Sequence, residues 1–332
     1  MKPTIKNLLA VASLAFIGLT SMMMAPPAMA TVRTCKLYVP PPGFPNNGYP
    51  ANTNNLYFCF PTAVAGTPED QLQLLARNTV ASALSGYTTA IRANMQSRNI
   101  NYYIFYNGRD AFDTLAVNIA PPEVDIKDNE SGRSWIFPNN TTNKTTPVVS
   151  AFIWTNTQYA NLHLNTRTPT TGDLPTAQQN QLSGTVRHES GHHLSRVWAQ
   201  QLSVLPLASS TIDQNYVNWG KALNMDGSRL SAQAVSDLET KYSRFAQIDP
   251  ITHKATGLKG NEIFAELIAM YTGGGAVPAE APFLTTNFPC ARWYTQQGFF
   301  ASNGLTPNIG TPKPPTAPAP GACYGNTNWN QP

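Results

Sequence analysis

Thr185-Val-Arg-His-Glu-Ser-Gly-His-His-Leu194 is the stretch around which the chain is organised. It contains the pattern His-Glu-x-x-His, which runs from His188 to His192. On a helix, residues four apart lie on one face, so the two histidines can offer their imidazoles to a single metal ion. Glu189 lies one position along, close enough to act on a water molecule beside that ion. The stretch therefore predicts a helical metal site that still needs a third ligand.

The first 30 residues have the features of a secretory signal peptide. Lys2 and Lys6 form a basic start, an apolar run covers 8–19, and Ala28-Met-Ala30 fits the small-residue pattern of a cleavage site. The apolar run is short for a membrane span, and no charged stop-transfer run follows it. We therefore expect residues 1–30 to be removed, the chain to be secreted or periplasmic, and no membrane span to remain.

Composition limits the classes of function. Removal of residues 1–30 would leave 302 residues (332 − 30), enough for one large catalytic domain or two small ones. The formal net charge would fall from +4 to +2, because Lys2 and Lys6 are the only charges removed. A balance that small, without a basic run, predicts no nucleic-acid partner. Hydrophobic residues make up 42% of the chain, which allows a sizeable core.

Four cysteines follow the signal peptide: Cys35, Cys59, Cys290 and Cys323. In an oxidising compartment an even number of cysteines predicts disulfides. Three pairings are possible, and proximity in the sequence favours Cys35–Cys59 and Cys290–Cys323. A cysteine-based zinc site is the alternative, but the chain has no C-x-x-C spacing.

Proline-rich segments flank a central region with regular patterns. Residues 31–64 are rich in Pro, Asn and Gly, which predicts an irregular N-terminal arm. Residues 304–332 are Pro-rich and predict an extended tail. The central domain is then expected to cover 65–303.

Hydrophobic patterns predict an α+β architecture for this domain. The strongest signals are a helix over about 68–97, with a weak point at Gly86, buried strands at 100–106 and 147–154, a motif helix from Asp173 to about 201, and a short helix over 262–271 capped by Asn261. Weaker strand candidates are 124–126, 135–137 and 159–164, and 203–257 are expected to be helical in pieces. The C-terminal part is therefore expected to be mostly helical.

Two carboxylates are candidates for the missing ligand. A catalytic zinc usually takes three protein ligands and one water molecule. Glu262 and Glu266 lie four apart on one face of an otherwise apolar predicted helix. To bury two unpaired carboxylates is costly, and a cation with its histidine ligands would offset that cost. An exposed acidic stripe on a surface helix is the alternative. His193 points about 100° away from His192 and is not expected to share the ion.

The two motifs together resemble a known family. The longer zinc motif with a third histidine is absent, because Trp198 stands at its last position. His188-Glu-Ser-Gly-His192 followed by Glu262-Ile-Phe-Ala-Glu266 resembles the gluzincin metallopeptidases, and among them the anthrax lethal factor-like catalytic domain. The resemblance covers about 65–290. It implies a zincin-like fold, in which a mixed sheet and an active-site helix precede a mostly helical C-terminal subdomain.

The same resemblance implies a set of roles. Zn²⁺ would be held by His188, His192 and Glu262, and Glu266 would accept the outer N–H of a ligating histidine. The implied activity is that of a secreted zinc metalloendopeptidase, a monomer that hydrolyses a protein or peptide substrate, with Glu189 as general base.

One role stays open among three residues. The oxyanion donor is a Tyr or His in the relatives that the resemblance implies, and the candidates here are Tyr242, His253 and Tyr271. His253, nine residues before Glu262, is preferred. Other classes of function also stay open: a secreted, zinc-containing binding or toxin-like protein without proteolysis, or an envelope protein in which the motif is accidental.

Overall fold

The computed structural model describes residues 34–37, 56–87, 100–105, 132–138, 149–155, 176–198, 214–273 and 279–301. Thr31–Pro332 forms one compact unit. The predicted signal peptide, the strand candidates 124–126 and 159–164, and the Pro-rich tail lie outside the described residues. Within the described residues, no helix is both long and apolar enough to cross a membrane.

A mixed sheet has the strand order β1-β2-β3-β5-β4. Its strands are β1 (Lys36–Leu37), β2 (Leu56–Cys59), β3 (Ile100–Phe105), β4 (Gly132–Pro138) and β5 (Val149–Thr155). β2, β3 and β5 are parallel to one another, whereas β1 and β4 pair antiparallel with their neighbours. Leu56, Tyr102 and Ile104 are buried in the hydrophobic core, as expected for parallel strands at the centre of a sheet.

Two of these strands come from the segment that was expected to be an irregular arm. Leu56, Phe58 and Cys59 of β2 are buried, so this segment contributes to the core. The composition of 31–64 as a whole predicts irregular structure, and a strand of four residues is too short to change that average. The Cys35–Cys59 disulfide confirms the favoured pairing. Cys290 is also disulfide-bonded, and Cys323, its expected partner, lies outside the described residues.

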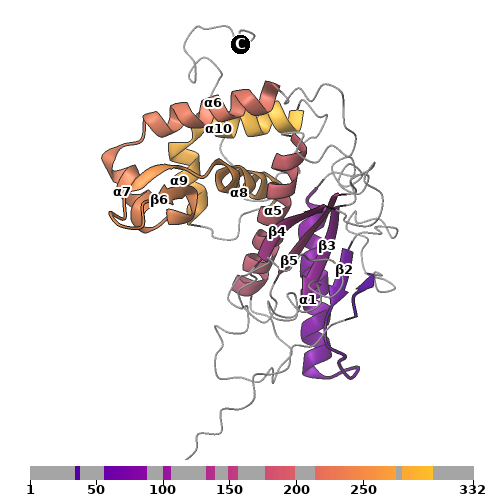
Figure 1. Ribbon diagram of the computed structural model, residues 1–332. Coiled ribbons are helices and arrows are strands. Elements are labelled where there is room, and N and C mark those ends of the chain that lie inside the picture. Colours follow the sequence, from indigo (N-terminus) through magenta and orange to yellow (C-terminus); the bar gives the residue numbers. More distant parts are fainter. Residues whose placement is uncertain are drawn as a thin grey trace, which may run out of the picture. The chain divides into compact units, whose positions relative to one another are not determined.

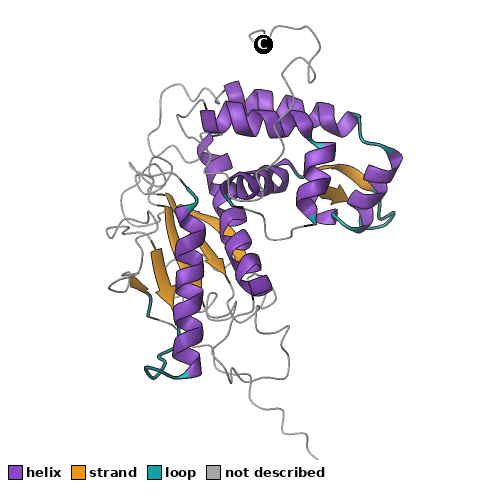
Figure 2. Cartoon of the chain, turned by 180° about the vertical axis from the view of Figure 1, so that it is seen from behind, coloured by secondary structure: helices purple, strands orange, loops and turns teal. Residues whose placement is uncertain are grey.

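Two helices lie on the same face of the sheet (Figures 1 and 2). α1 (Pro68–Ser85) begins as predicted, because Thr67 accepts a hydrogen bond from the Asp70 N–H and Pro68 occupies the first position. α5 (Thr176–Trp198) carries the histidine motif and contacts α1, β4 and β5. The predicted strands at 100–106 and 147–154 and the motif helix are confirmed to within a few residues.

The chain after α5 is mostly helical. Its helices are α6 (Gln214–Ser228), α7 (Ala232–Thr240), the 3₁₀ helix η1 (Ser243–Phe245), α8 (Gly260–Thr272), α9 (Glu280–Asn287), α10 (Pro289–Trp293) and the π-helix η2 (Tyr294–Ala301). The prediction of helical pieces is wrong at the antiparallel hairpin of β6 (Ala246–Ile248) and β7 (Ala255–Leu258). Strands of three and four residues are too short to show a clear alternation.

α8 brings carboxylates into the core. It begins at Gly260, so Asn261 lies inside the helix rather than at its cap, and every residue of 263–272 is buried. α8 contacts α5, η1, α9 and η2, and Figure 1 shows it beside the middle of α5. The chain is therefore an α+β protein, mostly helical with a small mixed sheet, in which the two predicted motifs meet.

Candidate metal centre

Hydrogen bonds fix the motif turn of α5 to its surroundings. The Tyr87 hydroxyl after α1 donates to the Arg187 carbonyl over 3.0 Å, and the hydroxyls of Tyr102 on β3 and Ser190 lie 3.3 Å apart. Arg187 in turn donates from Nη1 to the Gly273 carbonyl at the end of α8, also over 3.0 Å. These contacts hold the turn with the two histidines against the sheet, α1 and α8.

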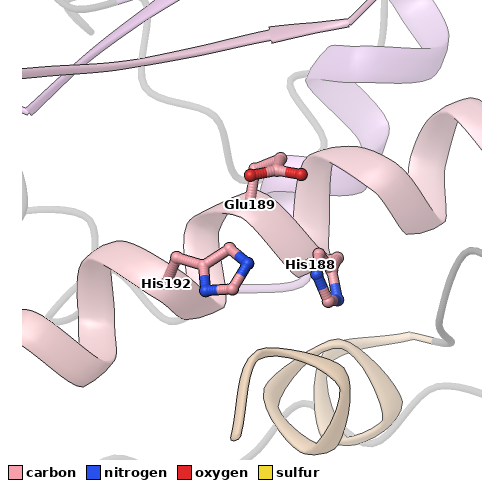
Figure 3. Close-up of side chains that lie close together, drawn as sticks. All are labelled: His188, Glu189 and His192. Atoms are coloured by element: carbon pink, nitrogen blue, oxygen red, sulfur yellow. The ribbon is translucent and has the colours of Figure 1, made fainter. Parts of the chain in front are cut away.

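His188 and His192 lie on the same face of α5, as the spacing predicts. Their ring centroids are 4.8 Å apart and their planes are nearly perpendicular. In Figure 3 the two imidazoles lie on the part of the helix nearest α8, and the Glu189 carboxylate lies beside them, farther from α8. One ligand atom from each of His188, Glu189 and His192 lies within 4.8 Å of the other two, so this group could hold a metal ion.

A second carboxylate approaches both imidazoles from α8. Glu262 Oε2 is 3.2 Å from His188 Nε2, and Glu262 Oε1 is 3.5 Å from His192 Nε2. The side chain of Glu262 is 25% exposed, whereas that of His188 is 6% exposed. The structure thus brings together the three residues that the resemblance implies as ligands.

Glu266 lies behind His188. Its Oε2 is 3.0 Å from His188 Nδ1, and its side chain is fully buried. The two ring nitrogens of His188 therefore face two different carboxylates of α8, Nε2 towards Glu262 and Nδ1 towards Glu266. The four-residue spacing on α8 puts one carboxylate on each side of the ring.

The carboxylates favour a positive charge at this place. Burial by itself lowers the pKa of His188, but the hydrogen bonds to Glu262 and Glu266 outweigh it and raise the pKa to about 9. Burial by itself raises the pKa of Glu262, but the hydrogen bond from His188 and the charges of His192 and Arg244 lower it to about 2.

Two further residues of the site were missed by sequence reasoning. Arg244 of η1 donates from Nη2 to Glu266 Oε2 over 2.7 Å and also to Oε2 of Glu280, in the first turn of α9. A buried Glu266 needs a counter-charge, and that was the only available signal. The sequence could not single out Arg244 from the nearby Lys241, because the contact joins residues 22 positions apart.

The preferred oxyanion donor, His253, lies in the exposed turn between β6 and β7. Its backbone has a φ of 56°, and its N–H donates to the Asp249 carbonyl over 2.9 Å. In the part of the chain that the structure describes, its imidazole makes no hydrogen bond to His188, His192 or Glu262. The catalytic role of His253 stays a prediction.

The other two candidates for that role have partners of their own. The Tyr242 hydroxyl donates to the Ala279 carbonyl over 3.3 Å, and its ring stacks on Phe283 with centroids 4.2 Å apart. Tyr271 is buried, which raises its pKa to about 12 despite the nearby Arg292. The hydroxyl of Tyr242 is therefore bonded to the main chain at Ala279, and Tyr271 lies beside Arg292.

Gly191 allows the close approach of α5 and α8. A Cβ atom at this position would lie 2.5 Å from Ala265 Cα and 2.7 Å from the Ala265 carbonyl oxygen. Those atoms belong to backbone and cannot rotate away. Gly191 lies between His188 and His192 in sequence, so any widening here would also move Glu262 away from the imidazoles.

We expect Gly191→Ala to lower the free energy of unfolding by about 1–3 kcal/mol, the usual cost of overpacking, and to weaken metal binding. Gly220→Ala is the matched control, because Gly220 also lies inside a helix, α6, and a Cβ there would meet no atom within 4 Å. It should be neutral or stabilising by up to about 1 kcal/mol. Thermal melts and metal titrations measure both effects. Equal melting temperatures for Gly191→Ala and the wild type would contradict the tight helix contact.

Comparisons with known proteins give no assignment. No protein-family model matches the chain, and no curated protein matches it. The function proposed below therefore depends on the residues of the site and on the fold that brings them together.

Proposed function

We propose that this protein is a zinc-dependent peptidase of the gluzincin type, similar to the anthrax lethal factor-like catalytic domain. The position of Glu262 supports the proposal most strongly. Ligands about 2.0–2.2 Å from a tetrahedral zinc ion lie about 3.3 Å from one another. Glu262 Oε2 lies 3.2 Å from His188 Nε2, and Glu262 Oε1 lies 3.5 Å from His192 Nε2, so each imidazole has a carboxylate oxygen at about that distance. The spacing therefore suits an ion between the three side chains.

The donor set favours zinc in a catalytic rather than a structural role. Two imidazoles and one carboxylate, with a fourth position for water, are typical of catalytic zinc, whereas structural sites have four protein ligands and are closed. Glu262 is 25% exposed and His192 is 11% exposed. The ligand set therefore lies at the boundary of the core, where a substrate can reach it.

The proposed mechanism gives zinc, Glu189 and Glu266 different roles. Zinc, when bound, supplies a Lewis acid that activates water and polarises a peptide carbonyl. Glu189 accepts the proton of the attacking water and passes it to the leaving amine. Glu266 accepts the hydrogen bond from His188 Nδ1, which leaves the Nε2 lone pair for the ion.

The fold is compatible with a zincin-like architecture and with an extended substrate. The mixed sheet, the motif helix α5 beside it and the mostly helical remainder occur in the expected order. Among the described strands, β4 is at one end of the sheet, and it contacts α5. An extended peptide can pair with such a strand through main-chain hydrogen bonds. This supports a protein or peptide as the substrate.

The disulfides support a location outside the cytoplasm. Cys35–Cys59 is formed and Cys290 is bonded, and such bonds persist in oxidising compartments. Together with the signal-like N-terminus, this favours a secreted or periplasmic enzyme.

The experiment for this proposal is a peptidase assay with removal and return of the metal. Purified protein is incubated with a library of quenched fluorescent peptides, with and without a zinc chelator. We expect hydrolysis that the chelator stops and that added Zn²⁺ restores. Hydrolysis that is insensitive to the chelator would contradict the mechanism. Bound zinc without any cleavage would favour the non-proteolytic binding or toxin-like alternative.

A further inference from the structure

Arg244 and His188 contact the same oxygen of Glu266. Arg244 Nη2 donates to Glu266 Oε2 over 2.7 Å, and His188 Nδ1 lies 3.0 Å from that same oxygen. We infer that Arg244 is a positioning residue for the metal centre, because it fixes the carboxylate that orients His188. This inference depends on the metal site of the proposed function but not on peptide hydrolysis.

One carboxylate oxygen of Glu266, Oε2, accepts hydrogen bonds from both His188 and Arg244. A carboxylate oxygen has two lone pairs, and on Oε2 one is used by the imidazole and the other by the guanidinium. With both directions occupied, the carboxylate cannot rotate without the loss of a charged contact. An acceptor held at Nδ1 keeps the His188 proton on that nitrogen, so Nε2 offers its lone pair to an ion.

Arg244 is itself held from two sides. Glu280 of α9 is buried and accepts from the same Nη2, and the guanidinium carbon lies 4.7 Å from the centre of the Phe245 ring. Although 32% of its side chain is exposed, the guanidinium is therefore fixed between α8 and α9. The chain of contacts from His188 through Glu266 and Arg244 to Glu280 connects a proposed ligand to an element outside the two motifs.

The positive charge of Arg244 also offsets the cost of burying the Glu266 carboxylate. Glu266 is 0% exposed, and a buried carboxylate without a cation is strongly unfavourable. A lysine at position 244 would keep the positive charge, but its side chain is shorter and lacks the planar, forked guanidinium group of arginine. The inference therefore predicts different results for the two substitutions of Arg244.

The test is the dissociation constant for Zn²⁺, measured by competition with a chelator on the full chain. Arg244→Met is expected to bind zinc about 10- to 100-fold more weakly, the usual effect of removing an outer partner of a metal ligand. Arg244→Lys should recover part of that loss. Arg77→Met is the matched control: Arg77 on α1 also lies over aromatic rings, of Phe58 and Phe60, and should leave the zinc constant unchanged. Melting temperatures of the zinc-free proteins are measured in parallel.

The outcomes separate this inference from the proposed function. Weaker zinc binding by Arg244→Met than by Arg77→Met, at equal loss of melting temperature, supports the positioning role, even if the wild type cleaves no peptide. A wild-type zinc constant in Arg244→Met overturns the inference and leaves the peptidase proposal intact. If Arg244→Met does not fold, Arg244→Lys decides, and an unchanged zinc constant there overturns the inference. No zinc binding by the wild type overturns both.

Discussion

Glu189→Gln is expected to abolish peptide hydrolysis and to leave the bound metal in place. Glutamine has the shape of glutamate but cannot accept the proton of the attacking water, and the loss of a general base usually costs about 10²- to 10⁴-fold in rate. Metal binding should persist, because the proposed third ligand, Glu262, lies 3.2 Å from His188 Nε2 and 3.5 Å from His192 Nε2 and is unchanged in this variant. The change should therefore affect kcat far more than zinc content.

Initial rates and zinc content of the same preparation measure the two effects. Glu239→Gln is the matched control, because Glu239 of α7 is bonded to Lys254 and to the Ala255 N–H rather than to the site. It should keep both rate and zinc. A Glu189→Gln variant with nearly the wild-type rate would rule out Glu189 as the base.

The second large effect is expected for Glu262→Gln. This change removes the negative charge between the two Nε2 atoms and places an amide group there. We expect zinc affinity to fall by more than about 100-fold, beyond the range of an outer partner, because Glu262 is proposed to touch the ion directly. Hydrolysis should fall with the loss of zinc and return only at high zinc concentration.

This substitution also decides between two carboxylates. Glu189 and Glu262 both lie near the imidazoles, and either could complete a three-ligand set. If Glu262 is the ligand, zinc is lost in Glu262→Gln and kept in Glu189→Gln and in the Glu239→Gln control. The reverse pattern would exchange the two roles. Equal zinc constants in all three variants would exclude both as ligands.

Much of the architecture was predictable because its signals are local. The helix at α1 has a Thr cap and a proline at the first position, and β3 and β5 are runs of β-branched and aromatic residues. Such patterns extend over six residues or more. The short strands β1, β2, β6 and β7 give no comparable signal. The place of β2 in the sheet also depends on a distant segment, because Leu56 lies opposite Tyr102 of β3.

The same distinction applies to the site. His188 and His192 could be found because their spacing of four puts them on one face of α5, and Glu262 and Glu266 because the same spacing puts them on one face of α8. Arg244 and Glu280 could not, because each reaches Glu266 or its partner from a different element of the chain. The need for Gly191 also depends on how closely α8 approaches, which only the packed structure shows.

The central claim is that His188, His192 and Glu262 together bind one zinc ion. The most direct measurement is the zinc content of the purified full chain by elemental mass spectrometry, after loosely bound ions have been removed. We predict one zinc per chain in the wild type and in Glu239→Gln, and little or none in Glu262→Gln. A wild-type chain without zinc, or a Glu262→Gln variant with the same content as the wild type, would contradict the claim.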